Sequence, residues 1–384
     1  MISIFLLIPI MSIFNIRFHS RLTVSLIIWY TVSIIGTIEQ QAICLQLTFE
    51  QNLYAGFYQL EIYPIFPLKF VCGGRFDDHP VVGSHFSPRF GAVLSVLDKH
   101  TVHASYNKAF RNPSLLESFI DVNKFRGGNL TGVHGSTGFS DKDIREGREL
   151  DSELIKAYEV GYQGFWFDRM KLQVDGFYTE VEDLISMISL ERDTDGFFFN
   201  FGGGKNYGVE ISSEFIIRKD LRMLVNYTWQ DLEDIDFDTA SVRERIPTPL
   251  PEEEQSWINF SRNEGHAPVH KFNFGLRATI PRNLTTFLNV HYVSTSENWY
   301  ASYITPQEQP NKMTAGTYTI ANLALTYRFS QNLDFTVTVQ NLLDNRHFEY
   351  PDNNYSYTNS LRNLNIVESE EIGRLWLIGA KLHF

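Results

Sequence analysis

Two histidines, His100 and His103, have the spacing in this sequence that most invites a metal site. Imidazole nitrogens are common metal ligands in proteins. The residues that follow His100 alternate between apolar and polar, which predicts a β-strand. Positions three apart on a strand point to opposite faces, so we do not expect the two imidazoles to share an ion. His100 also falls in a predicted turn, and the sequence predicts neither a metal site nor a cofactor.

Other stretches resemble parts of known binding or catalytic motifs, but each lacks residues that the complete motif requires. In the glycine-rich stretch 202–208, Asn206 stands where a phosphate-binding loop requires Ser or Thr, so we expect a loop tip that enters a strand. The acidic stretches 231–238 and 251–255 fall in one predicted loop, and the first offers oxygen ligands for Ca²⁺. A solvated acidic loop and a cation-binding loop both remain open there. No G-x-S-x-G motif occurs, and we do not expect an enzyme.

The charge and the aromatic content narrow the class of protein. The formal net charge is −12 and the pI is about 5.4, which disfavours a nucleic-acid partner because such proteins need a basic surface. Aromatic residues make up 14% of the chain, and from about residue 68 they recur at alternate positions. This period of two predicts an all-β protein.

Five hairpins with short turns follow one another in this pattern. The predicted turns are 97–100, 167–170, 217–220, 281–283 and 330–332. Long polar links separate the hairpins, at roughly 110–154, 182–206, 233–269, 294–317 and 343–371. A strict alternation of short and long connections places all short turns at one end of an up-and-down sheet, as in transmembrane barrels. With segments near 55–76 and 372–384, about twelve strands are expected.

The two faces of these strands differ as a membrane barrel requires. One face carries aromatic and aliphatic residues, and the predicted strands run about nine to eleven residues, enough to cross a bilayer when tilted. The other face carries charges suited to a water-filled lumen, namely Lys171, Asp175, Glu210, Glu214, Lys271, Arg277 and Arg328. We therefore predict an antiparallel transmembrane β-barrel in contact with outer-membrane lipid.

Residues 1–50 differ from the rest and are separated here from a barrel portion at 51–384. They contain two apolar runs, 2–14 and 22–36, each shorter than a membrane-spanning helix. Read from Met11, the segment has a basic start, an apolar core and a polar exit, as in a secretory signal. A signal, an N-terminal anchor and a non-native leader on a truncated gene all remain open.

Several stretches together resemble the barrel of TonB-dependent outer-membrane receptors. They are AFRNPSLLE (109–117), ELIKAYEVGYQ (153–163), NYGVEISSE (206–214), VQNLLDNRHFEY (339–350) and GRLWLIGAKLHF (373–384). The resemblance implies the outer membrane of a Gram-negative bacterium and active uptake of a scarce nutrient, such as an iron–siderophore complex, cobalamin or a glycan. It also implies a TonB energy-coupling complex and the barrel-assembly machinery as partners.

The chain departs from this family in length. The family forms a barrel of about 22 strands with a plug in its lumen, whereas this sequence predicts about half the strands and no plug. The resemblance is therefore to the C-terminal part of the barrel, and coupling to TonB would require a plug supplied elsewhere. A non-functional fragment of a disrupted receptor gene and a smaller, porin-like diffusion barrel are the alternatives.

Two groups of residues are candidates for function. Aromatic residues in the long loops could contact a bulky small-molecule or metal-chelate ligand, namely Phe197, Phe198, Phe199, Trp299, Tyr300 and Tyr303. The last strand places Trp376, Leu382 and Phe384 on one face and ends on an aromatic residue at the short-turn end. By the same resemblance, these three form a signal for the barrel-assembly machinery, and we expect the chain to be complete at this end.

Overall fold

The structure of the 384-residue chain is a computed structural model. The described backbone covers 2–7, 13–18, 22–39, 46–79, 82–114, 117–118, 121–125, 128–131, 150–189, 196–200, 202–235, 259–260, 263–280, 283–300, 311–347 and 373–383. Within these ranges, no helix has the length and hydropathy that crossing a membrane would require.

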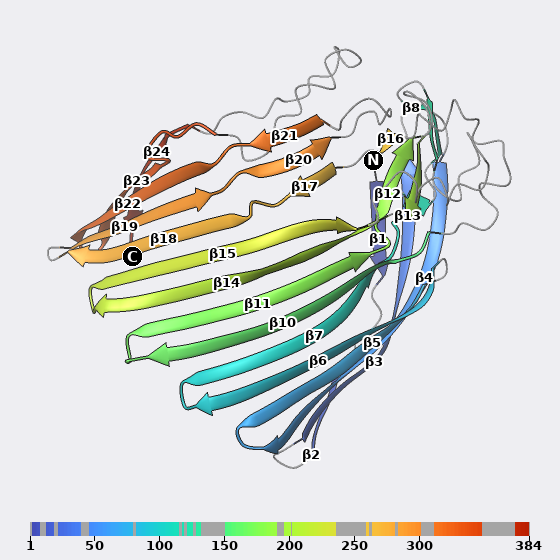
Figure 1. The fold of residues 1–384 in the computed structure, drawn as a ribbon, viewed down its shortest axis with the longest axis horizontal. Helices are drawn as coiled ribbons and strands as arrows, with labels where there is room; N and C mark the ends of the chain where they lie inside the picture. The colour runs from blue at the N-terminus through green and yellow to red at the C-terminus, as the bar shows by residue number, and fades with distance from the viewer. Residues whose placement is uncertain are drawn as a thin grey trace.

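One large antiparallel sheet dominates the fold (Figure 1). Its main strands pair in chain order: β3 (Leu22–Glu39), β4 (Gln46–Ile65), β5 (Leu68–His79), β6 (Gly83–Leu97), β7 (His100–Arg111), β10 (Glu153–Trp166), β11 (Met170–Glu182), β14 (Gly203–Arg218), β15 (Leu221–Ile235), β18 (His270–Ile280), β19 (Leu284–Val293), β22 (Tyr318–Ser330), β23 (Leu333–Gln340) and β24 (Leu375–Leu382). Both β1 (Ile2–Leu7) and β2 (Ile13–Phe18) pair with β3. The predicted fold class is confirmed.

Short turns and long connections separate to opposite ends of the sheet. Figure 1 shows the β6–β7, β10–β11, β14–β15 and β18–β19 turns along one end, and the strand ends that lead into the long connections along the other. The turn residues explain why the sequence located these hairpins: Asp168 and Asn283 adopt positive φ angles of 54° and 70°, which Asp and Asn tolerate better than other non-glycine residues.

The long connections contain short strands that the sequence analysis did not predict. A five-stranded sheet joins β8 (Asp121–Phe125), β9 (Gly128–Thr131), β12 (Ile185–Ser189), β13 (Gly196–Asn200) and β16 (Asn259–Phe260). A three-stranded sheet joins β17 (Asn263–His266), β20 (Ser296–Tyr300) and β21 (Asn311–Ala315). Strands of two to five residues show too few alternations to stand out from a polar loop.

One face of the sheet carries a continuous row of aromatic rings. Phe90, Tyr106, Tyr158, Tyr178 and Tyr207 are register partners across β6, β7, β10, β11 and β14. Neighbouring ring centroids lie 6.4, 5.0 and 6.1 Å apart over the first four. This row fits the aromatic belt of a membrane barrel.

A charged row lies on the same face, two residues closer to the long connections. Its members, again register partners, are Lys108, Lys156, Glu180 and Lys205. The Nζ of Lys156 also lies 2.5 Å from the carboxylate of Glu182. Side chains on this face therefore change from aromatic to charged over two residues, as expected where a strand leaves hydrocarbon for polar headgroups.

The opposite face is polar. Lys171 pairs in register with Glu214, and Asp175 with Glu210, so the charges predicted for the lumen lie on one face of neighbouring strands. Several strands are longer than predicted: β14 has 16 residues and β15 has 15. The excess lies toward the long connections, beyond what a bilayer crossing requires.

The described sheet is open. Strand β24 pairs with β23 alone, and every residue of β24 is exposed. At the other edge, β3 pairs with β4 and with the short strands β1 and β2. The leader role of residues 1–50 stays a prediction.

The final described residue lies at the short-turn end. His383 donates its backbone N–H to the carbonyl of Asn332 at 2.9 Å, and Asn332 Nδ2 donates to the carbonyl of His383 at 2.8 Å. Trp376 and Leu382 are 59% and 61% exposed on the edge strand. Phe384 lies outside the described residues, so the assembly signal stays a prediction.

Candidate functional site at the base of the long connections

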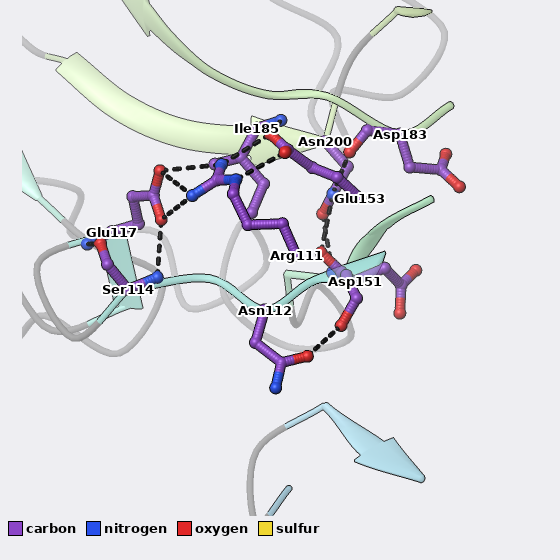
Figure 2. Close-up of polar contacts among 10 residues, drawn as sticks. Arg111, Asn112, Ser114, Glu117, Asp151, Glu153, Asp183, Ile185 and Asn200 are labelled. Atoms are coloured by element: carbon purple, nitrogen blue, oxygen red, sulfur yellow. Dashed lines mark hydrogen bonds and ion pairs between the residues drawn. The ribbon is translucent and has the colours of Figure 1, made fainter. Parts of the chain in front are cut away.

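A guanidinium group joins two carboxylates where β7 ends. Arg111 and Glu153 are register partners, and Arg111 Nε and Nη2 donate to the Glu153 carboxylate at 2.5 and 2.6 Å. Arg111 Nη1 also donates to Glu117 at 3.1 Å (Figure 2). The Glu153 side chain is 9% exposed, and the bidentate geometry is the strongest form of this ion pair.

Glu117 is held by a second set of donors. The backbone N–H of Ser114 donates to Glu117 Oε2 at 2.6 Å, and the N–H of Glu117 donates back to Ser114 Oγ at 3.2 Å. This reciprocal pair is a capping box. Burial raises the pKa of Glu117, but the hydrogen bonds from Arg111 and Ser114 outweigh it and hold the pKa below its usual range.

The same network reaches the next long connection. Ile185, the first residue of β12, donates its N–H to Glu153 Oε1 at 2.8 Å. Asn200 Oδ1 accepts the N–H of Asp151 at 2.7 Å, and Asn200 Nδ2 donates to the carbonyls of Asp151 and Asp183 at 2.9 and 2.8 Å (Figure 2). The bases of the connections after β7 and after β11 are therefore tied together.

A cavity of about 310 Å³ lies beside this network, where β6 and β7 separate. The pairing of β6 with β7 begins at Arg89. The preceding residue, Pro88, has no N–H to donate. His85 lines the cavity and stacks on Phe110 with ring centroids 4.8 Å apart. Ser152, which is 2% exposed, contacts His85 Nε2 at 2.9 Å and donates to Asn112 Oδ1 at 2.7 Å. The cavity therefore opens onto the same strand ends as the network.

The base of a third long connection, the one between β23 and β24, lies at the end of β23. Asn341, 2% exposed, accepts the N–H of Asn345 at Oδ1 and donates from Nδ2 to the carbonyl of Asn345, both at 3.0 Å. Its own N–H donates to Asn322 Oδ1 at 2.9 Å. Asp344 then accepts the N–H of Arg374 at 3.0 Å, which ties the two ends of the connection between β23 and β24.

The aromatic ligand candidates fall into two separate small sheets. Phe197, Phe198 and Phe199 lie on β13, and of these the structure describes only the side chain of Phe198, which is half-buried. Trp299 and Tyr300 lie on β20, and their side chains are outside the described part of the chain. Tyr303 lies outside the described residues altogether. A ligand role for these six residues stays a prediction.

The sequence analysis did not predict this network, although four of its residues lie in the stretches that resemble the receptor family. Arg111, Ser114 and Glu117 all belong to AFRNPSLLE, and the S-x-x-E spacing of a capping box was visible there. Glu153 opens the stretch ELIKAYEVGYQ, but nothing in the sequence sets the register between strands joined by so long a connection.

The two histidines lie on opposite faces, as predicted. His100 Nδ1 contacts the hydroxyl of Tyr162 at 2.6 Å. His103 Nε2 lies 3.1 Å from Glu159 Oε1 and 3.6 Å from Asp175 Oδ1. The second histidine thus meets carboxylates from neighbouring strands, which the spacing of the histidines could not reveal.

Comparison with known proteins gives relatives that agree with this fold. Two curated relatives from strains of Vibrio cholerae serotype O1, each named iron-regulated outer membrane virulence protein, are 22% identical over 305 residues. The match covers 76% of this chain and 40% of each relative, so the chain spans less than half their length.

Solved structures share the fold. The siderophore receptor PirA from Acinetobacter baumannii gives a TM-score of 0.69 at 15% identity, covering 97% of this chain and 54% of that one. The ferric-catecholate import receptor Fiu from E. coli K12 gives 0.61 at 15% identity, covering 97% and 53%.

A family model described as TonB-dependent receptor-like, β-barrel, matches residues 33–342. The relatives are outer-membrane proteins, which agrees with the belt on one face of the sheet and the charges on the other. With most of its length matched, the chain belongs to the TonB-dependent receptor-like β-barrel family of the Gram-negative outer membrane.

Proposed function

We propose that this chain supplies barrel strands and external loops to an outer-membrane receptor that takes up a scarce nutrient, in the first place an iron–siderophore complex. The observation that carries the proposal is the network at Arg111, Glu153 and Asn200, which fixes the bases of two long connections on the strand ends. A receptor that recognises a bulky ligand with its loops requires such fixed bases. The names of the curated relatives and the solved structures favour iron as the cargo.

The open sheet determines what this function requires. Unpaired N–H and C=O groups at a strand edge are costly in hydrocarbon, so both edges must be paired by further strands. In the proposed receptor, those strands complete the barrel, a plug fills its lumen, and a TonB complex acts on the plug. The barrel-assembly machinery inserts the chain. Among the described strands, β24 and the N-terminal strands do not pair with each other, which disfavours a self-closed porin of this size.

The test begins with ligand binding. The assembled receptor that contains this chain, purified from outer membranes in detergent, is titrated with ferric enterobactin, a ferric hydroxamate and cobalamin, and quenching of its tryptophan fluorescence is followed. We expect saturable binding of one ferric siderophore and weaker binding by Arg111→Met, whose loop bases are loosened. Lys99→Met, at a short turn on the opposite end, serves as the matched control.

Each alternative gives a different result. A porin-like barrel binds none of the three probes but conducts small solutes in a liposome-swelling assay. A non-functional fragment fails to reach the outer membrane fraction and shows no heat-modifiable band on an unboiled gel. Either result overturns the proposed function.

A further inference from the structure

Three potential metal ligands meet on the polar face, away from the long connections. His103 lies on β7, Glu159 on β10 and Asp175 on β11, three strands that run side by side (Figure 1). One ligand atom from each lies within 4.8 Å of the other two. His103 Nε2 is 3.1 Å from Glu159 Oε1 and 3.6 Å from Asp175 Oδ1. The group combines one imidazole and two carboxylates.

A glycine makes room for this group. Gly161 is the register partner of both His103 and Asp175. A Cβ at Gly161 would lie 2.1 Å from Asp175 Oδ1 and 2.3 Å from His103 Cε1, closer than any real Cβ contact. The imidazole and the carboxylate therefore converge over a position that only glycine leaves open.

One carboxylate oxygen in the group is buried without a hydrogen bond. Asp175 Oδ1 is inaccessible to solvent and accepts no hydrogen bond, and the His103 nitrogen at 3.6 Å is too distant to donate one. The other oxygen, Oδ2, accepts a hydrogen bond from Gln173 Nε2 at 2.8 Å, which orients the carboxylate. A buried, unsatisfied carboxylate oxygen is costly, and a cation beside it would remove that cost.

We propose that His103 Nε2, Glu159 and Asp175 Oδ1 bind a divalent first-row transition-metal ion, with Zn²⁺ as the probe. Two ligands of a tetrahedral Zn²⁺, each about 2.1 Å from the ion, lie roughly 3.4 Å apart. The distances of 3.1 and 3.6 Å bracket this value. Three protein ligands leave a fourth position open to water or to a donor from another segment.

The surroundings favour a cation. Glu210 on β14 is the register partner of Asp175, so a third carboxylate lies on the next strand, beside Asp175. Gln173 acts as the partner that orients a metal ligand, a common feature of protein metal sites. The competing arrangement is a protonated imidazole that is ion-paired to Glu159 and Asp175 without a metal.

The test is a Zn²⁺ titration of the full, tag-free chain after treatment with a chelator. We expect one binding site per chain in calorimetry, with affinity reduced at least tenfold in His103→Ala and in Asp175→Asn. His100→Ala is the matched control, because His100 lies on the same strand but on the opposite face, and it should bind as the unchanged chain does. Gly161→Ala keeps all three ligands but displaces them, and should weaken binding as well.

Spectroscopy of the unchanged chain decides the question even where a variant fails to fold. X-ray absorption at the zinc edge should show one imidazole together with oxygen ligands. A first shell of oxygen alone, binding by His103→Ala equal to that of the unchanged chain, or no binding at all would overturn the proposal. The last result would assign the group to an ion pair of protonated His103.

Discussion

Replacing Arg111 by methionine tests whether the loop-base network holds the long connections in place. The variant keeps the length of the side chain but removes the guanidinium. In this network, Glu153 then accepts a hydrogen bond only from the Ile185 N–H, and Glu117 still accepts one from the Ser114 N–H. Breaking a buried ion pair costs about 3–5 kcal/mol. Arg111 is 42% exposed, so water compensates in part, and we expect a loss of about 2–3 kcal/mol of local stability.

Hydrogen exchange of the backbone amides measures this loss directly. A loss of about 2–3 kcal/mol corresponds to exchange roughly 30 to 150 times faster, since about 1.4 kcal/mol is tenfold. The increase should appear at the amides of Ile185 and Ser114. In the control Lys99→Met, the lost partner is Asp168 at the short-turn end, and both side chains are more than half exposed. That surface pair contributes about 0–1 kcal/mol, so exchange at the two loop-base amides should not change.

A double variant sharpens this measurement. In Arg111→Met/Glu153→Gln the buried charge of Glu153 is no longer left without its cation, so the double variant should lose less than the sum of the two single variants. Unchanged exchange at Ile185 and Ser114 in Arg111→Met, or additive losses in the double variant, would refute the reasoning.

Three further predictions concern other parts of the sheet. Asn341→Ala removes two side-chain hydrogen bonds to the backbone of Asn345 and should lower the free energy of unfolding in urea by about 1–3 kcal/mol. Glu117 stabilises its segment at a pH above its unfolded value near 4.5, and this contribution is lost as the pH falls through its lower folded pKa. Exchange in that segment should therefore accelerate as the pH falls below about 4.5, and Glu117→Gln should remove the pH dependence. Gly208→Ala places a Cβ 2.2 Å from a backbone oxygen of β15 and should lower the urea midpoint, whereas Gly379→Ala, with nothing within 4 Å, should not.

The sequence predicted the barrel strands well because each signal was local. Alternation marks a strand within itself, and Asp168 and Asn283 mark turns at the positive φ angles that such residues tolerate. Strand ends toward the long connections were predicted less well. β14 begins at Gly203, inside the predicted link 182–206, because glycines read as loop residues even where they enter a strand.

The candidate site could be predicted only in part, because its contacts join distant segments. Arg111 and Glu153 are 42 positions apart, and their pairing depends on a register that no residue between them sets. His103, Glu159 and Asp175 come from three different strands. The spacing of His100 and His103 predicted no metal site and so gave no indication of this group. The capping box at Ser114, by contrast, is local and could have been read from four residues.

The closely spaced aromatic and charged rows limit how deeply this sheet can sit in the bilayer. Two residues advance about 7 Å along a strand, or roughly 5 Å along the membrane normal once the strand tilt is included. Sinking the sheet by that amount would draw Lys108, Lys156 and Lys205 just inside the hydrocarbon, at about 0–1 kcal/mol each, and deeper insertion would raise the cost toward about 2–4 kcal/mol each at the midplane. In a membrane of different thickness, the lipid should therefore thin or thicken around this sheet while the sheet keeps its level.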